Sequence, residues 1–241
     1  MAATVCGVAS YESQWAKEIT DLLASASAHG LRLAPDTDKR LMLFCQEVCA
    51  ESPYVNLVSG SDLPHIVTKH VAASLGVLLV EQPRVDQRWV DVGTGGGFPG
   101  VVVKICCPEA KIVLLDSSEK KTRFLEGLRS KLGLEDLEVL RGRVQDLRTV
   151  GVPGTEGSWP GSVIDRGFDV ILMRAVASLA ESLGLIEPIA SPKARLLTFK
   201  GPAWEEEVRL ADEAMRRHGW RFRGITPIPW TRSRILCLDR G

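Results

Sequence analysis

The stretch from Asp91 to Gly100 constrains the fold of this 241-residue chain more than any other. It follows a short apolar run and reads Asp-Val-Gly-Thr-Gly-Gly-Gly-Phe-Pro-Gly, so that proline stands where a helix would begin. Closely spaced glycines favour a tight turn with positive φ angles, and proline is common in the first turn of a helix. The stretch therefore predicts a strand, a turn and a helix whose free N–H groups point at a ligand.

Two acidic residues accompany this turn in the predicted βαβ unit. Asp91 stands two residues before the first glycine, and a second apolar run over residues 111–115 ends at Asp116. An acid that closes the second strand can accept hydrogen bonds from the hydroxyl groups of a ribose. This role suits NAD and S-adenosylmethionine alike, and a glycine-rich turn without any ligand is the third interpretation.

The spacing of Asp91, Gly93, Gly95 and Gly97 resembles the first motif of the Rossmann-like S-adenosylmethionine methyltransferases. In those enzymes the acid before the glycines orients the amino-acid end of the cofactor, and no pyrophosphate has to be bound. The resemblance implies S-adenosyl-L-methionine as the cofactor.

The composition is that of an ordinary globular protein, with 45% apolar and 25% charged residues. No apolar run approaches the roughly 18 residues of a membrane span, and the first residues lack the basic region and apolar core of a signal peptide. We therefore expect a cytoplasmic protein. The six cysteines have the spacing of neither a zinc site nor a disulfide framework, so we expect reduced, buried thiols and no metal.

Apolar residues at helical spacing dominate residues 1–85. One helix is predicted over residues 10–28, and a second begins after Asp36, which can cap it, and breaks at Ser52-Pro53. A third helix is predicted over residues 63–80. We expect this region to be a helical extension packed on the rest of the chain.

From residue 86 onward, predicted strands and helices alternate, and two final strands follow each other without a helix. Alternation predicts a parallel sheet, and the last two strands predict an antiparallel end. The expected fold is α/β, a Rossmann-like, mostly parallel seven-stranded sheet in a domain of residues 86–241, with a surface insertion at about 150–167. The strands are expected at 88–92, 111–115, 137–140, 168–173, 195–199, 220–225 and 234–238, and the helices at 99–106, 119–132, 179–189 and 204–218.

Ligands of an open α/β sheet bind beyond the carboxyl ends of its strands. Besides the two acids, this rule selects residues 143–146, Arg174 and Lys200. A guanidinium directly after an apolar strand, as at Arg174, indicates an anion or carbonyl partner, and a salt bridge to Glu181 or Glu187 is the alternative.

Within residues 143–146, Val144 could supply an apolar contact to an adenine and Gln145 a hydrogen bond, although Val144 could also be a core residue. His70 lies on an otherwise apolar helix, where a histidine is more often part of the core than a catalyst. Motifs for adenine amino methylation, for covalent attack by cysteine, and for nucleophile elbows, Walker A loops or zinc peptidases are absent.

Basic residues exceed acidic ones only in residues 195–241, so an RNA partner would have to meet local patches. Lys120, Lys121 and Arg123 open a predicted helix, where cations oppose the helix dipole, and this suggests a phosphate-facing patch. The side chains that could extend the patch or stack on bases are Arg141, Arg143, Arg216, Arg217, Arg221, Arg223, Arg232, Arg234, Trp159, Trp220, Phe222 and Trp230, although aromatic residues more often pack in the core.

Taken together, the motifs at 91–100, 115–125, 141–146, 174–179 and 200–201 resemble the bacterial 16S rRNA guanine-N7 methyltransferases. These form the ribosomal RNA small subunit methyltransferase G family, also called the glucose-inhibited division protein B family. The resemblance runs from about Asn56 to the C-terminus. The chain departs from the family pattern in carrying Val58 for a threonine and Ala73 for an aspartate.

By this resemblance, the chain methylates N7 of a guanine in a single-stranded loop of 16S rRNA. Because N7 carries a lone pair and no proton, a positioned in-line transfer needs no general base. The candidate cofactor-binding residues are Asp91, Gly93, Gly95, Phe98, Asp116, Val144, Gln145 and Arg174, of which Arg174 is also the catalytic candidate.

The implied partner is 16S rRNA or a small ribosomal subunit particle, and we expect a monomer that needs neither metal nor membrane. Three alternatives stay open. They are a methyltransferase of another RNA, a protein or a small molecule; an NAD-dependent oxidoreductase; and a catalytically silent scaffold.

Overall fold

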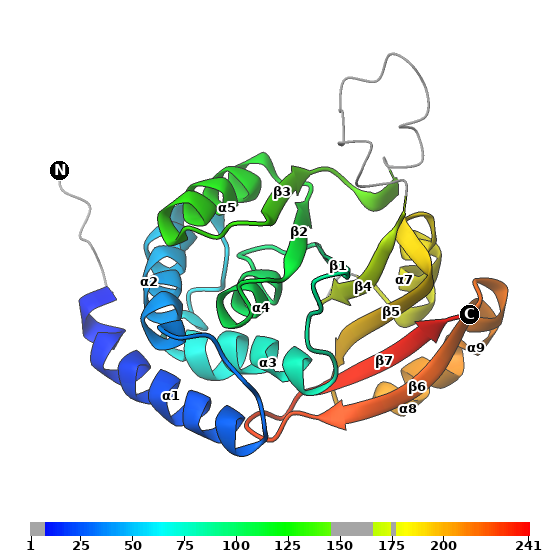
Figure 1. Cartoon of the computed structure of the whole chain (residues 1–241), viewed down its shortest axis with the longest axis horizontal. Helices are drawn as coiled ribbons and strands as arrows, with labels where there is room; N and C mark the ends of the chain where they lie inside the picture. The colour runs from blue at the N-terminus through cyan, green and yellow to red at the C-terminus, as the bar shows by residue number, and fades with distance from the viewer. Residues whose placement is uncertain (1–7, 146–165, 175–176) are drawn as a thin grey trace, which may run out of the picture.

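The computed structural model describes residues 8–145, 166–174 and 177–241 (Figure 1). These residues form a seven-stranded sheet in the order β3-β2-β1-β4-β5-β7-β6. The predicted alternation is confirmed, and most strands lie within two residues of their predicted bounds. The strands are β1 (Arg88–Val92), β2 (Lys111–Asp116), β3 (Leu137–Arg141), β4 (Phe168–Met173), β5 (Ala190–Lys200), β6 (Trp220–Pro227) and β7 (Arg234–Arg240).

Strands β1 to β5 run parallel, whereas β7 pairs antiparallel with both β5 and β6. The register places Val92 of β1 beside Leu115 of β2 and Met173 of β4, so these strands end at one edge of the sheet. The order reverses between β1 and β4, and in such sheets the ligand site lies at this reversal.

Alternate residues of β1 and β2 face two separate cores. Trp89 and Leu114 pack into one core with α1 to α5, whereas Val90 and Leu115 pack into the other with α7 to α9. The N-terminal helices therefore share a continuous core with β1 and β2 (Figure 1). The helices are α1 (Val8–Ala28), α2 (Thr37–Val55), α3 (Ala72–Leu75), α4 (Gly100–Cys106), α5 (Glu119–Leu132), α7 (Leu179–Ile186), α8 (Trp204–Leu210) and α9 (Asp212–Arg217).

Helix α2 runs through Ser52-Pro53, and the predicted break there is wrong. Pro53 lies in the last turn, where its missing N–H removes a single hydrogen bond. The hydroxyl of Ser52 donates to the carbonyl of Val48 at 2.6 Å, which adds a bond at the same turn. The helix ends instead at Asn56, whose φ of 54° turns the chain away.

The helix predicted over residues 63–80 is helical but irregular. It passes from a 3-10 turn, η1 (Leu63–His65), through a π-helical turn, η2 (Ile66–Val71), and α3 to a second 3-10 turn, η3 (Gly76–Leu79). A π turn is rare and is often found at functional sites.

Other boundaries also differ from the prediction. The helix expected over 204–218 divides at Ala211 into α8 and α9, and the one expected over 179–189 ends in a 3-10 turn, η5 (Glu187–Ile189). Asp36 precedes α2 as predicted, but it pairs with Lys39 at 2.6 Å and caps nothing. The insertion predicted at 150–167 lies outside the described residues, apart from its last two.

No helix in the described part of the chain is long and apolar enough to span a membrane. Within the same residues, no group of three or more His, Cys, Asp or Glu side chains could hold a metal ion. The prediction of buried, reduced thiols is confirmed for Cys45, Cys49, Cys106, Cys107 and Cys237.

Candidate active site

The turn after β1 takes the left-handed conformation at three glycines. Gly93, Gly95 and Gly97 have φ angles of 71°, 59° and 95°, a region that side chains disfavour. A Cβ atom at Gly97 would lie 2.6 Å from Cγ2 of Val101 in α4. The glycines therefore let the chain pass from β1 into α4 within a few residues, as the sequence predicts.

Asp91 in β1 accepts hydrogen bonds both from this turn and from the start of α4. Its Oδ2 accepts hydrogen bonds from the hydroxyl of Thr94 at 2.7 Å and from the N–H of Gly100 at 2.8 Å. The side chain is fully buried, and its Oδ1 has no hydrogen-bond partner among the described residues. Burial raises the pKa of Asp91 to about 6, against the opposing effects of its two hydrogen bonds and of Arg174. One oxygen of this carboxylate is thus available to a donor on a ligand.

Asp116, the last residue of β2, holds the other side of the turn. Its Oδ2 accepts a hydrogen bond from the N–H of Gly95, and its Oδ1 accepts one from the N–H of Ser118, both at 2.9 Å. Each carboxylate oxygen keeps a second lone pair. Both predicted acids therefore meet at the glycine turn, and Asp116 stays able to accept from a hydroxyl.

A hollow of about 290 Å³ opens where β1, β2 and β3 end. Four of the predicted residues line it together, namely Gly93, Asp116, Val144 and Gln145. Leu185 of α7 forms part of its wall, and nothing in the sequence near Leu185 indicated this, because α7 follows a different strand. The hollow has an acid on one side and apolar side chains on the other, which suits a nucleoside. Val144 is also buried in the core, so both interpretations of it apply.

Arg174 follows β4 and forms no salt bridge with any other described residue. The predicted alternative partners are engaged elsewhere, since Glu181 binds Ser178 as a helix cap and Glu187 pairs with His218 at 2.9 Å. Among the described residues, the buried Nη1 of Arg174 has no hydrogen-bond partner, and the guanidinium lies 5.6 Å from the ring centroid of Phe199. Burial lowers the pKa of Arg174, and the charges of Asp91 and Asp62 oppose that effect. The salt-bridge alternative is therefore wrong.

Phe98 does not line the hollow and packs against the N-terminal helices. Its ring centroid is 4.9 Å from that of Phe44 and 5.2 Å from that of His70. His70 in turn has its Nε2 3.3 Å from Oδ2 of Asp62. Burial, with a smaller contribution from Arg174, lowers the pKa of His70 to about 4. His70 and Asp62 thus adjoin the predicted site, although the sequence did not select them.

The predicted site residues therefore form two groups on either side of the glycine turn. One group surrounds the nucleoside-sized hollow, and the other brings Asp91 and Arg174 together with His70 and Asp62. The buried Oδ1 of Asp91 and Nη1 of Arg174, which lack partners among the described residues, offer one acceptor and one donor. S-adenosyl-L-methionine needs a nucleoside site next to a site for an amino-acid end, so the residues present fit it.

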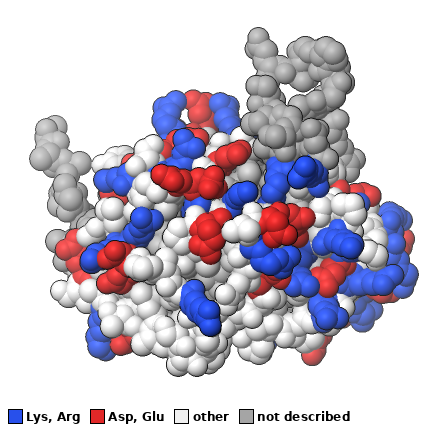
Figure 2. Space-filling view, in the orientation of Figure 1, with Lys and Arg blue, Asp and Glu red and all other residues white. Residues whose placement is uncertain are grey.

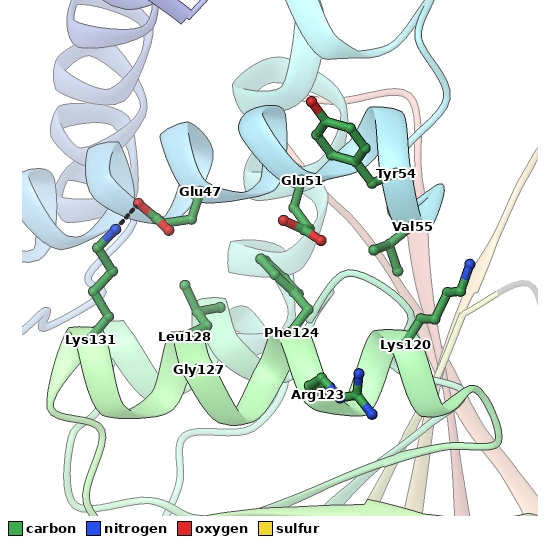
Figure 3. Close-up of a pocket in the computed structure, with 10 residues that line it drawn as sticks. All are labelled: Glu47, Glu51, Tyr54, Val55, Lys120, Arg123, Phe124, Gly127, Leu128 and Lys131. Carbon is green, nitrogen blue, oxygen red and sulfur yellow. Dashed lines mark hydrogen bonds and ion pairs between the residues drawn. The ribbon is translucent and has the colours of Figure 1, made fainter. Parts of the chain in front are cut away.

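A larger hollow, of about 540 Å³, lies between α2 and α5 (Figure 3). Lys120 lies at one end of it, and Lys131 lies at the other, where it pairs with Glu47 at 2.5 Å. Glu51 projects from α2 toward Phe124 of α5. This hollow is not the reaction site, because the residues that line it come from two helices and include no strand end.

The basic patch predicted at the start of α5 is partly neutralised. Arg123 and Arg141 both pair with Glu119, at 2.8 and 2.9 Å. Within the part of the chain that the structure describes, Lys120 and Lys121 have no ion-pair partner. No neighbouring acid of the described chain offsets their charges, which therefore remain available to phosphate.

Acidic and basic side chains intermix over the face shown in Figure 2, with basic side chains gathered toward β6 and α9. Arg216 and Arg217 in that region pair with acids one turn earlier in α9. Lys200, at the end of β5, likewise pairs with Glu207 of α8. Of the predicted aromatic residues, Trp220 is buried, whereas Phe222 is 41% exposed and stacks on Trp204. Trp159 lies outside the described residues.

Comparison with known proteins shows the family to which this chain is similar. A family model described as rRNA small subunit methyltransferase G matches residues 37–226. The Ribosomal RNA small subunit methyltransferase G of Clostridium novyi is 32% identical over 72% of this chain and 67% of its own. The protein of that name from Roseiflexus castenholzii is 33% identical over 90% of this chain and 89% of its own.

A solved structure shares the fold alone. It is a SAM dependent methyltransferase from Aquifex aeolicus, with a TM-score of 0.51 and 19% sequence identity, covering 77% of this chain and 96% of that chain. The two chains thus share a fold despite little sequence similarity.

Proposed function

The chain belongs to the rRNA small subunit methyltransferase G family, and from this membership we propose that it methylates N7 of a guanine in 16S rRNA with S-adenosyl-L-methionine. The observation that carries the proposal is a nucleoside-sized hollow at Asp116 together with buried atoms of Asp91 and Arg174 that have no hydrogen-bond partner among the described residues. Both lie at the reversal of strand order, where this class of sheet binds its ligands.

In the proposed complex, Asp116 accepts from the ribose, and Val144 and Gln145 flank the adenine. Asp91 Oδ1 receives a donor from the amino-acid end, and Gly93 and Gly95 allow the backbone to approach closely. Phe98 supports this group from the side of the N-terminal helices. When bound, S-adenosyl-L-methionine supplies a methyl group on a positively charged sulfur.

The residues around the target base act by position and charge. Guanine N7 has a free lone pair and loses no proton, so the chain needs no general base. This agrees with the surroundings of His70, which burial keeps neutral at pH 7. Arg174 would orient the base or the cofactor carboxylate through its Nη1, in a pocket that excludes water.

The partner in this proposal is 16S rRNA or a small ribosomal subunit particle, and the protein acts in the cytoplasm as a monomer without a metal. A base in a single-stranded loop can be turned out of its stack and presented to the site edge. The exposed Lys120 and the half-buried Lys121 would meet its phosphates.

The test is mass spectrometry of small-subunit rRNA from cells that lack the protein and from cells complemented with it. We expect one 7-methylguanosine to disappear in the deletion and to return with the wild-type chain, but not with Arg174→Ala. Purified protein should then methylate the corresponding RNA or particle. An unchanged rRNA, with methyl transfer to a protein or a metabolite instead, would refute the substrate. Binding of NADH in place of S-adenosyl-L-methionine in a calorimetric titration would refute the enzyme class.

A further inference from the structure

Asp62 is a carboxylate at the edge of the site that the proposed transfer leaves without a role. It lies in the loop before η1 and does not line the cofactor hollow. Its charge acts on Arg174, as does that of Asp91. Its side chain is 26% exposed, whereas Asp91 is fully buried. Asp62 is therefore accessible from solvent, and so to RNA, whereas Asp91 is not.

Two neighbouring residues hold this carboxylate in place. Lys69 Nζ lies 2.5 Å from Oδ1 of Asp62, and His70 Nε2 lies 3.3 Å from Oδ2. Consecutive residues of an α-helix point about 100° apart, but here both belong to the π-helical turn η2 and both reach one carboxylate. Two consecutive residues of the π-helical turn η2 thus hold Asp62, and π turns are often found at functional sites.

The charges around Asp62 leave it able to accept further hydrogen bonds. Burial and the nearby Arg174 lower the pKa of His70 to about 4, so His70 is neutral at pH 7 and donates its Nε2–H to Asp62. Lys69 and His70 lower the pKa of Asp62, which is therefore ionised. Among the described residues, each of its oxygens has one donor, which leaves a second lone pair for a ligand.

We propose that Asp62 recognises the target guanine by accepting hydrogen bonds from its N1–H and its N2 amino group, with Lys69 and His70 as positioning residues. This inference rests on the function proposed above. The two adjacent donors on the Watson–Crick edge of guanine match the two oxygens of a carboxylate, whereas adenine presents an acceptor at N1. Asp62 would thus decide which purine is accepted.

The same placement suits the charge change of the reaction. The lone pair of N7 forms a bond to the methyl carbon while the carbon–sulfur bond breaks and its electron pair stays on sulfur. The positive charge moves to the purine, and no proton is released. An ionised carboxylate on the purine edge stabilises that charge, and a neutral His70 adds no opposing one.

The test compares RNA that carries guanine at the target position with RNA that carries inosine, which lacks the N2 amino group. Single-turnover methylation and RNA affinity by fluorescence anisotropy are measured for the wild type, Asp62→Asn and Lys69→Met. The matched control is Asp36→Asn, because Asp36 also pairs with a lysine, at 2.6 Å, but lies at the start of α2. Cofactor affinity and thermal unfolding show whether each variant is folded.

We expect the wild type and Asp36→Asn to prefer guanine by at least about tenfold in both assays, since a site built to bind a donor rejects the analogue that lacks it. Asp62→Asn should reduce this preference to less than about threefold with unchanged cofactor affinity, and Lys69→Met should reduce it by a smaller factor. An undiminished preference in Asp62→Asn, or an equal loss on both RNAs, would overturn the inference alone. Absence of methylation of the guanine RNA by the wild type would overturn the proposed function and this inference with it.

Discussion

Arg174 places a charged group where an apolar strand ends and leaves one of its nitrogens without a partner in the described chain. A buried guanidinium is costly unless hydrogen bonds and an opposite charge compensate for it. Here the charges of Asp91 and Asp62 act on it, and Phe199 lies under it. A donor that is already oriented before the ligand arrives costs no rearrangement during the reaction.

We therefore expect Arg174→Ala to abolish methyl transfer, with a loss of at least about 100-fold in single-turnover rate. Arg174→Lys should also be impaired, since an ammonium cannot reproduce the planar fork of a guanidinium. Arg84→Ala, an exposed arginine in the segment before β1, is the control and should retain the wild-type rate. Full turnover by Arg174→Ala would remove this residue from the site.

Asp116 is expected to contribute to cofactor affinity through the ribose. Asp116→Ala should raise the Kd for S-adenosyl-L-methionine at least tenfold, which corresponds to about 1.4 kcal/mol. Part of this effect would come from the lost hydrogen bond to the N–H of Gly95. Calorimetric titration measures it, with Asp86→Ala, an exposed acid on the opposite edge of the sheet, as the control. An unchanged Kd would contradict the ribose role.

The raised pKa of Asp91 makes stability depend on pH. In the unfolded chain this pKa is about 3.9, and in the folded chain it is about 6. Between these values the folded state binds the extra proton, so the free energy of unfolding falls as pH rises from about 4 to 6. Two pKa units correspond to roughly 3 kcal/mol.

Urea unfolding from pH 4.5 to 7 checks this for the wild type and Asp91→Asn. As pH rises, the free energy of unfolding of the wild type should fall relative to that of Asp91→Asn, because asparagine carries no charge to bury. His70 acts in the opposite direction, since its lowered pKa favours the folded state at higher pH, but it is common to both proteins. Parallel pH profiles would show that burial of the Asp91 charge costs little.

At the scale of elements, the site depends on how closely α4 approaches β1 and β2. A Cβ atom at Gly100, the first residue of α4, would lie 2.4 Å from Cδ2 of Leu114 and 2.9 Å from Oδ2 of Asp91. The absence of a side chain at this position is what lets the N–H of Gly100 reach the carboxylate.

Gly100→Ala should accordingly lower the free energy of unfolding by about 1–3 kcal/mol, the usual cost of overpacking, and weaken cofactor binding. Gly127→Ala is the matched control in α5, because a Cβ atom there would meet nothing within 4 Å. It should stabilise the protein by about 0.5–1 kcal/mol through helix propensity. Urea unfolding compares the two variants, and equal stabilities would contradict the close approach of α4.

At the scale of the molecule, the formal net charge is zero, so attraction to RNA has to come from local groups. Arg123, Arg141, Arg216 and Arg217 of the predicted patches pair with acids of α5 or α9. Lys120 and Lys121 differ from them, because neither has an ion-pair partner in the described chain. Both lie in the first turn of α5, the helix that follows the strand end with Asp116.

Lys120→Glu/Lys121→Glu should weaken RNA binding and reduce the slope of log Kd against log salt by about one to two. Lys17→Glu/Lys193→Glu makes the same change in net charge away from the site and should leave the slope nearly unchanged. Fluorescence anisotropy over a salt series measures both. Equal slopes for the two double variants would mean that binding follows total charge instead of this patch.

Short-range features were predictable from the sequence because few neighbouring residues decide them. The glycine turn has its positive φ angles at Gly93, Gly95 and Gly97, and α5 ends at Gly133 with φ 57°, as expected. Strand and helix alternation likewise follows from local periodicity, and it led to the correct seven-stranded fold. The family motifs are contiguous stretches, so they too were visible without a structure.

Only the tertiary structure decided which side chains meet. It left Nη1 of Arg174 without a partner among the described residues, brought Asp62 and His70 to its side, and placed Leu185 at the cofactor hollow. It also turned the regular helix expected over residues 63–80 into a segment with a π turn. These features depend on burial and charge between segments far apart in the chain, and such interactions are set by packing, which no local pattern encodes.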